Sequence, residues 1–222
     1  MTLPGRTLAI GDIHGSSAAL ATLVQVVAPR TDDTLVVLGD IVDRGPGTRE
    51  AIDQLLELGN RCNLVLVLGN HEEMMFDALS GGEWEAAWLR YGGEATLNSY
   101  GGDPGAIPAS HLEFLKSGRD FYETEREIFI HANVEPGIAL EKQSPEWLRW
   151  THITGFEPPH SSGKRIVCGH TPQRSGVPLV FPGWAGIDTL AYGPGWLTCL
   201  DVSTDEFFQA NNVGQYRTSF LA

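Results

Sequence analysis

The chain has 222 residues, 42% of them hydrophobic, which suffices for one sizeable core, and we predict a single domain over residues 1–222. Its 28 acidic and 15 basic residues give a formal net charge of -13, which excludes the basic surface of a general nucleic-acid or anionic-membrane binder. No apolar run approaches the ~18 residues of a membrane span, and the N-terminal segment lacks a signal-like apolar core, so we expect a soluble cytoplasmic protein.

The first third of the chain repeats one pattern three times: an apolar strand, a polar turn and a helix. Strands are expected at Thr7–Gly11, Thr34–Gly39 and Leu64–Gly69, and the turns after them read DIHGS, DIVDRGPG and NHEE. The helices are expected over Ser16–Ala28, with Ser16 or Ser17 as cap, over Thr48–Leu58, and from NHEE onward. This order predicts a βαβαβ core with a parallel sheet and right-handed crossovers.

The middle of the chain reads as a helical insertion over the edge of this sheet, residues 79–116. A helix is expected from Glu83 to a break at Gly92 and Gly93, and a second over His111–Lys116. Trp84 and Trp88 lie four residues apart, and we expect them to pack the insertion onto the body rather than to stack on a substrate.

The second half returns to strands. DFYETE and EIFIH read as a hairpin about Glu125 and Arg126, RIVCGHTP repeats the strand-and-turn pattern, and GWLTCLDVS and the tail from Glu206 to Thr218 supply further strands. We therefore predict an α/β fold, an α/β/β/α sandwich of two packed sheets with helices outside.

Polar residues gather where the predicted strands end. Loops at the carboxyl ends of parallel strands share one edge of a sheet, so seven residues distant in sequence should converge in space. These residues are Asp12, His14, Asp40, Asp43, Arg44, Asn70 and His71, and two later strand ends add His131 and His170.

Six of these side chains form a set of metal donors. Asp12 and His14 are two positions apart and can point to one side, and the Asp40 carboxylate has two oxygens with which to bridge two ions. With the neutral donors Asn70, His131 and His170, the set mixes oxygen and nitrogen and suits Mn²⁺, Fe or Zn²⁺ better than Ca²⁺ or Mg²⁺. Two such ions ~3.5–4 Å apart would acidify a bridging water to hydroxide for direct attack on phosphorus.

Three neighbouring residues would complete a phosphoester hydrolase. His71 is a candidate general acid for the leaving group, and Asp43 could orient its ring and favour the imidazolium. The planar fork of Arg44 can hold two phosphate oxygens, and the turn Gly45-Pro46-Gly47 lets the backbone approach closely.

Five motifs between Gly11 and Pro172, GDIHG, GDIVDRG, GNHEE, HAN and GHTP, resemble the phosphoprotein phosphatase branch of the calcineurin-like metallophosphoesterases, especially its small bacterial and phage members. The resemblance implies the metallophosphoesterase fold and two divalent ions, with manganese the first choice. It places one ion on Asp12, His14 and Asp40 and the other on Asp40, Asn70, His131 and His170. It gives His71 the acid role with Asp43 behind it, and makes Arg44 a phosphate ligand.

Two positions bear on how closely the family pattern applies. The family usually has a second phosphate arginine, and the WLR of PEWLRW makes Arg149 the candidate, against an exposed structural role. The third metal histidine is followed in many members by Ala-Gly or Gly-Gly, whereas Ala132 and Asn133 stand here, which could alter the pocket.

The resemblance predicts one function and leaves two alternatives open. The first, which is the predicted one, is a phosphomonoesterase acting on phosphoserine or phosphothreonine in proteins, with phosphotyrosine as a further substrate and phosphorylated proteins or small phosphoesters as its partners. The second is a hydrolase of diadenosine tetraphosphate, although that branch has alanine at the position of Asp43. The third is a metal-binding module without catalysis.

The remaining candidates receive structural interpretations. Cys62, Cys168 and Cys199 form no CxxC pair, and we expect small buried hydrophobes in a reducing cytosol. His111, His152 and His160 lie outside the motifs and are expected on the surface or in loops. Asp188 in GIDT is expected to form a turn, with support of a metal ligand as the alternative.

Overall fold

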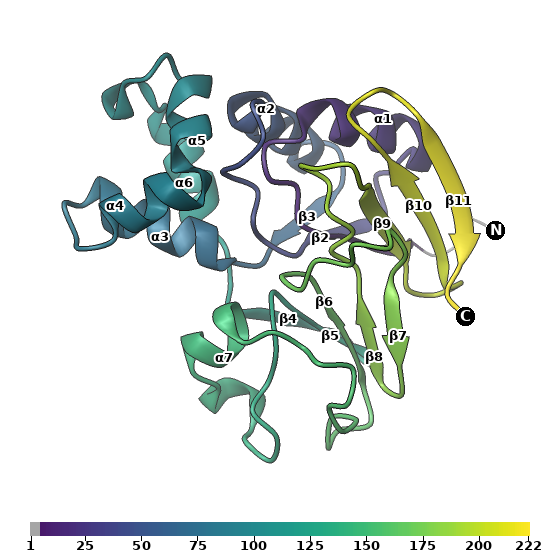
Figure 1. Cartoon of the computed structure of the whole chain (residues 1–222). Coiled ribbons are helices and arrows are strands. Elements are labelled where there is room, and N and C mark those ends of the chain that lie inside the picture. The colour runs from purple at the N-terminus through teal and green to yellow at the C-terminus, as the bar shows by residue number, and fades with distance from the viewer. Residues whose placement is uncertain (1–4) are drawn as a thin grey trace.

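A computed structural model describes residues 5–222 as two mixed β-sheets packed together with helices on the outside (Figure 1). The predicted α/β/β/α layering is confirmed by three clusters of buried side chains. One lies between the first sheet and its helices, one between the two sheets, and one on the outer face of the second sheet.

The first sheet contains the predicted βαβαβ core. Its strand order is β11-β10-β9-β1-β2-β3. Strands β1 (Thr7–Ile10), β2 (Thr34–Val37) and β3 (Asn63–Leu66) are parallel and are joined by helices α1 (Ser17–Val27) and α2 (Thr48–Gly59). The antiparallel strands are β9 (Leu197–Asp201), β10 (Glu206–Ala210) and β11 (Tyr216–Phe220).

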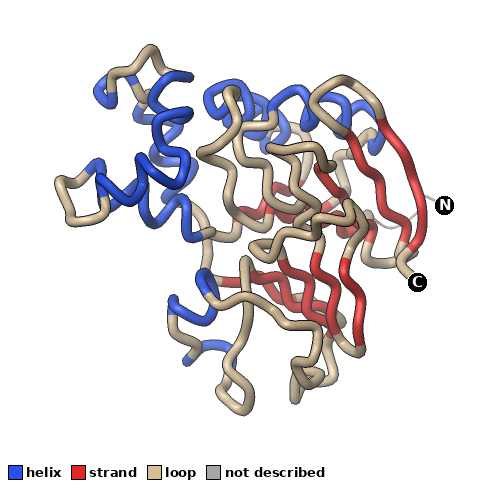
Figure 2. Tube along the Cα trace, in the orientation of Figure 1, coloured by secondary structure: helices blue, strands red, loops and turns tan. Residues whose placement is uncertain are grey.

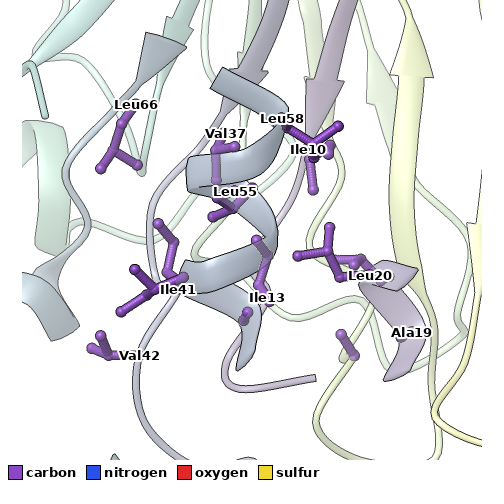
Figure 3. Packing of buried hydrophobic residues seen from close by; sticks show 14 of the residues in the cluster. Ile10, Ile13, Ala19, Leu20, Val37, Ile41, Val42, Leu55, Leu58 and Leu66 are labelled. Carbon is purple, nitrogen blue, oxygen red and sulfur yellow. The ribbon is translucent and has the colours of Figure 1, made fainter. Parts of the chain in front are cut away.

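The neighbouring strands β1 and β2 are buried on both faces of this sheet, which explains why they are apolar in succession. Leu8 and Ile10 of β1 face the helices, whereas Ala9 between them faces the second sheet. On the helix side, Leu55 of α2 and Leu20 of α1 cover the strands (Figure 3). The carboxyl ends of β1, β2 and β3 thus emerge from a packed core.

The second sheet has the order β4-β5-β6-β8-β7. The predicted hairpin is present: β4 (Phe121–Glu123) and β5 (Glu127–Ile130) pair antiparallel, with Phe121 opposite Ile130. Strands β6 (Arg165–Cys168) and β8 (Trp184–Gly186) continue in parallel, and β7 (Leu179–Phe181) forms the edge. Helix α7 (Pro145–Trp150) covers its outer face through Leu148.

The middle of the chain is helical and lies together at one end of the sheets, as the blue segments at the left of Figure 2 show. It comprises α3 (Asn70–Leu79), α4 (Glu85–Trp88), a π-helix (Leu89–Gly93), α5 (Glu94–Ser99) and α6 (Ala109–Lys116). The expected break at the two glycines is present, because Gly92 has non-helical backbone angles, φ 120° and ψ 4°, and the chain kinks there before α5.

One histidine prediction is wrong. His111 is buried in α6, where its ring bonds to the Tyr100 hydroxyl at 2.8 Å and to Asp53 at 3.0 Å, so it is a core residue rather than a surface one. The three cysteines are buried thiols, as expected. In residues 5–222 no helix is long and apolar enough to cross a membrane. The single-domain assignment stays a prediction.

Candidate metal centre

The strand-end residues converge as predicted, on loops whose backbone is strained. Left-handed φ angles occur at His14 (45°), Asp40 (49°), Asp43 (74°), Arg44 (68°) and His170 (60°). Such conformations are unfavourable for residues other than glycine and persist where the surrounding structure fixes them, most often at functional sites. Here they turn the side chains of the loops after β1, β2 and β6 toward one point.

A buried carboxylate holds two of these loops together. Glu72 accepts the backbone N–H groups of Gly69 and Asp40, at 3.0 and 2.8 Å, through one oxygen. Its other oxygen accepts those of Ile41 and Val42, at 2.7 and 3.2 Å. Sequence reasoning missed this residue, although it stands in the GNHEE motif. Burial and the charge of Asp40 raise the pKa of Glu72 to about 7.

Asp40 lies between two groups of donors and presents one oxygen to each. Its Oδ2 is 3.3 Å from His14 Nε2, in a group that also contains His71. Its Oδ1 is 3.4 Å from His131 Nε2, in a group that contains His170. Burial opposes ionisation of Asp40, but the neighbouring rings of His131, His71 and His14 hold its pKa well below the usual range. A carboxylate in this position can bridge two cations.

Three histidines are oriented by backbone carbonyls. His14 Nδ1 lies 2.9 Å from the Val42 oxygen, His131 Nδ1 2.7 Å from the Leu38 oxygen, and His170 Nε2 3.0 Å from the Trp150 oxygen. Since a carbonyl can only accept, each of these nitrogens carries the proton. The other nitrogen of each ring therefore turns a lone pair toward the site, which is how metal-binding histidines are held.

The facing lone pairs call for a cation. His131 Nε2 is 3.2 Å from His170 Nδ1 and 3.1 Å from Asn70 Oδ1, so acceptors face one another. A proton shared between the rings does not remove this conflict, because burial and the neighbouring His131 ring lower the pKa of His170 to about 3. Burial lowers the pKa of His131 as well. These buried His/Asp clusters fit a binuclear divalent metal site.

Asp12 borders the two groups without belonging to either. Its carboxylate accepts the His170 backbone N–H, at 3.1 and 3.0 Å, and burial together with Asp188 and Asp40 raises its pKa well above the usual value. Asp188 is also buried; its Oδ1 accepts the Leu190 N–H in a turn, while its Oδ2 has no hydrogen-bond partner. Acidic groups crowded in this way also suit a cation, and ligation by Asp12 stays a prediction.

The predicted acid and its orienting carboxylate are in contact. His71 Nδ1 is 2.7 Å from Asp43 Oδ2, which leaves Nε2 directed into the site. Two residues of the insertion hold Asp43 in turn: the Trp88 indole N–H lies 3.0 Å from both carboxylate oxygens, and the Thr96 hydroxyl donates to Oδ1 at 2.7 Å. Trp88 therefore does more than the core packing that we expected, and Thr96 had no sequence signal.

Arg44 extends over the His14 group. Its two terminal nitrogens lie 2.8 Å from His14 Nε2 and 3.0 Å from His71 Nε2. The guanidinium also lies 4.6 Å from the ring centre of Tyr192, which sequence reasoning missed. The Arg44 backbone N–H donates to the Gly92 carbonyl at 3.2 Å, so the insertion contacts this arginine directly.

These groups line a cavity of about 230 Å³. Asp40, Arg44, Asn70, His71 and His170 contribute its polar wall, and Met74, Tyr91, Trp150 and Pro172 contribute to the rest. His152 is exposed, as expected, but it also lines the cavity, because its ring stacks on His170 with centroids 4.4 Å apart. His160 bonds within its own loop.

Arg149 points elsewhere in this structure. Its guanidinium pairs with Asp120 and, at 3.3 Å, with Glu73, and it is not among the residues that line the cavity. These two carboxylates account for its orientation. Its role as a second phosphate arginine stays a prediction.

Comparison with known proteins identifies one family for most of the chain. Residues 5–183 match the family described as calcineurin-like phosphoesterase. The symmetrical bis(5'-nucleosyl)-tetraphosphatase of Salmonella typhimurium is 41% identical over 76 residues, which is 34% of this chain and 26% of that protein. The alignment thus spans about a quarter of the length of that curated relative.

Two solved structures share the fold over nearly the whole chain. One, provisionally described as a diadenosine tetraphosphatase, is 22% identical with a TM-score of 0.69, covering 99% of this chain and 96% of the other. The cold-active protein-tyrosine phosphatase of a psychrophilic Shewanella species is 18% identical with a TM-score of 0.66, covering 97% and 80%. At these identities the similarity shows the α/β metallophosphoesterase fold.

Proposed function

The chain belongs to the calcineurin-like phosphoesterase family and is a metal-dependent phosphoesterase, and on that premise we propose that it hydrolyses dinucleoside tetraphosphates. The observation that carries the reaction class is Asp40, which presents one carboxylate oxygen to each of two buried donor groups. The substrate class rests on the curated relative that is 41% identical over 76 residues.

Two divalent ions bound here would supply Lewis acidity and an activated water for attack on phosphorus. We assign their ligands as Asp12, His14 and Asp40 for one ion and Asp40, Asn70, His131 and His170 for the other. The mixed oxygen and nitrogen donors suit Mn²⁺, Fe or Zn²⁺, and Mn²⁺ is our first choice from the family resemblance.

The chain's own residues bind the phosphate and handle the proton. The Arg44 guanidinium contacts the ring nitrogens of His14 and His71. When substrate binds, it can instead donate to two phosphoryl oxygens, because its planar geometry favours bidentate contacts with phosphate. His71 can donate a proton from Nε2 to the leaving oxygen, and the contact with Asp43 at 2.7 Å holds its ring for that transfer.

A second function is favoured by that same contact. The leaving group of a phosphoserine is an alkoxide, which needs a proton as the bond breaks, whereas a nucleoside polyphosphate leaves as a stable anion. A buried pair of His71 and Asp43 is therefore most useful for phosphomonoesters such as phosphoserine, phosphothreonine and phosphotyrosine in proteins.

A side-by-side assay separates these functions. Metal-depleted protein with Mn²⁺ added back is given diadenosine tetraphosphate and a phosphoserine peptide at equal concentrations, and kcat/KM is measured for each. Higher kcat/KM for the dinucleotide supports the proposal. Higher kcat/KM for the peptide replaces it with the protein phosphatase function, and turnover of neither contradicts both.

A further inference from the structure

The cavity beside the metal centre has an aromatic wall with no role in the proposed chemistry. Tyr91 and Trp150 both line it, together with the apolar side chains of Met74 and Pro172. Tyr91 is 55% exposed, and Trp150 is half-buried with its ring edge-to-face against Trp84, at 4.9 Å between centroids. Aromatic side chains that line a cavity next to the candidate phosphate arginine provide a surface on which a flat ring can stack.

The backbone fixes each of these aromatic residues to a polar residue of the site. Tyr91 precedes Gly92, whose carbonyl accepts the Arg44 N–H at 3.2 Å. The carbonyl of Trp150 itself lies 3.0 Å from His170 Nε2, which donates to it. One aromatic residue is thus placed next to the phosphate arginine and the other next to a candidate metal ligand.

The conformation of Gly92 fixes the position of Tyr91 beside Arg44. Tyr91 directly precedes a kink, because the backbone of Gly92 is non-helical, with φ 120° and ψ 4°. A Cβ on Gly92 would come within 2.6 Å of the Arg44 nitrogen, so only glycine permits the close approach. The Trp150 ring is held as well, because its indole N–H donates to Glu73 at 3.0 Å.

We propose that Tyr91 and Trp150 form a subsite for a planar aromatic ring that is attached to the phosphate of the substrate. This inference rests on the proposed function. A nucleobase of a dinucleotide and the ring of an aryl phosphate share this chemistry. Stacking of a base on an aromatic side chain is sequence-tolerant, so the subsite would select ringed over aliphatic phosphates rather than one base over another.

The test compares three substrates with the Mn²⁺-loaded protein: diadenosine tetraphosphate, phenyl phosphate and glycerol 2-phosphate, which has no ring. For each ringed substrate, kcat/KM is divided by kcat/KM for glycerol 2-phosphate. Tyr91→Ala is expected to lower this ratio about 5- to 150-fold, the effect of losing one stacking contact, and Tyr91→Phe is expected to retain it. Phe156→Ala is the control, because Phe156 is 92% exposed and does not line the cavity.

The outcomes separate this proposal from the proposed function. A fall in the ratio for phenyl phosphate, with no wild-type turnover of the dinucleotide, supports the subsite and removes the dinucleotide as substrate. An unchanged ratio for both ringed substrates overturns the subsite whatever is hydrolysed. Calorimetry provides a readout without turnover: Tyr91→Ala should weaken binding of adenosine 5'-monophosphate 5- to 150-fold more than binding of inorganic phosphate, and equal weakening would overturn the proposal.

Discussion

The indole N–H of Trp88 lies 3.0 Å from both carboxylate oxygens of Asp43, across 45 residues of sequence. Asp43 in turn contacts His71, the candidate general acid, so a residue of the helical insertion is linked to that histidine through one carboxylate. The insertion therefore contacts the candidate site as well as forming its rim.

The first prediction concerns this contact. Trp88→Phe keeps the ring in place and removes the N–H, so Asp43 loses a hydrogen bond and His71 is held less firmly. We expect kcat for an alkyl phosphate to fall about tenfold, the effect of losing one hydrogen bond to a charged group, with two bound metals retained. Trp84→Phe is the matched control, since the Trp84 ring is 38% exposed and contacts Trp150 instead. An equal fall in both variants would show that packing alone is involved.

The second prediction separates the acid from the rest of the site. His71→Asn should lower kcat about 10²- to 10⁴-fold on an alkyl phosphate, because a positioned proton donor is lost. The loss should be much smaller on a nitrophenyl phosphate, whose leaving group needs no proton. Rates on the two substrates check this, and an equal loss on both would contradict the acid role.

The third prediction concerns the shared carboxylate. Asp40→Asn removes the negative charge that lies between the two donor groups, so affinity for both ions should fall. Metal content after dialysis against limiting Mn²⁺ measures this directly. Asp77→Asn, in α3 but outside the donor groups, should bind as the wild type does. A normal metal content in Asp40→Asn would rule out the bridging assignment.

The fourth prediction concerns the carboxylate that ties the loops together. Glu72→Gln places an amide NH₂ against backbone N–H groups that need acceptors, so we expect the free energy of unfolding to fall by about 2–4 kcal/mol in denaturant titrations. Glu57→Gln on the exposed face of α2 should change it by less than about 0.5 kcal/mol. A similar small change in Glu72→Gln would show that the four contacts contribute little.

The fifth prediction is a pH dependence of stability. Burial alone would raise the pKa of Asp33, but hydrogen bonds from Arg6 and Arg30 outweigh it and hold that pKa well below its ordinary value. Because the folded pKa is depressed, the stabilisation is complete above the unfolded pKa of about 3.9 and is lost as the pH falls through the folded pKa. Asp33→Asn should therefore lower the unfolding free energy by about 1–3 kcal/mol at pH 7.

Below about pH 4 the difference between Asp33→Asn and the wild type should narrow, because the wild-type carboxylate becomes protonated first in the unfolded chain. Asp32→Asn is the neighbouring control, since the Asp32 side chain is 48% exposed and its nearest arginine nitrogen lies 3.6 Å away. A difference that stays constant from pH 7 to pH 3 would contradict the account.

The layering of the fold follows from sequence because its signals are local. Leu35, Val36 and Val37 are apolar in succession, which indicates a strand buried on both faces, and the structure places Val36 between the sheets and its two neighbours under the helices. The same local reasoning placed Asp40, His131 and His170 at strand ends, which the packing of the two sheets brings together.

What the sequence did not reveal depends on contacts between distant segments. No motif near Trp88 or Thr96 indicates that these residues bind Asp43. Their sequence positions are equally compatible with side chains that only pack in the core. His111 looked like a loop histidine because its partners Tyr100 and Asp53 come from other elements. Glu72 lies inside a motif, but its four backbone donors come from the loops after β2 and β3. Those loops meet only because the two strands are neighbours in the sheet.

If two ions held by a shared carboxylate drive phosphoester hydrolysis, a stoichiometric metal titration should show that both are needed. Metal-depleted protein is titrated with Mn²⁺, and bound metal per chain is measured in parallel with phosphate release from phenyl phosphate. We expect turnover to rise to its maximum as the second ion binds. Full turnover with one ion or none bound would contradict it.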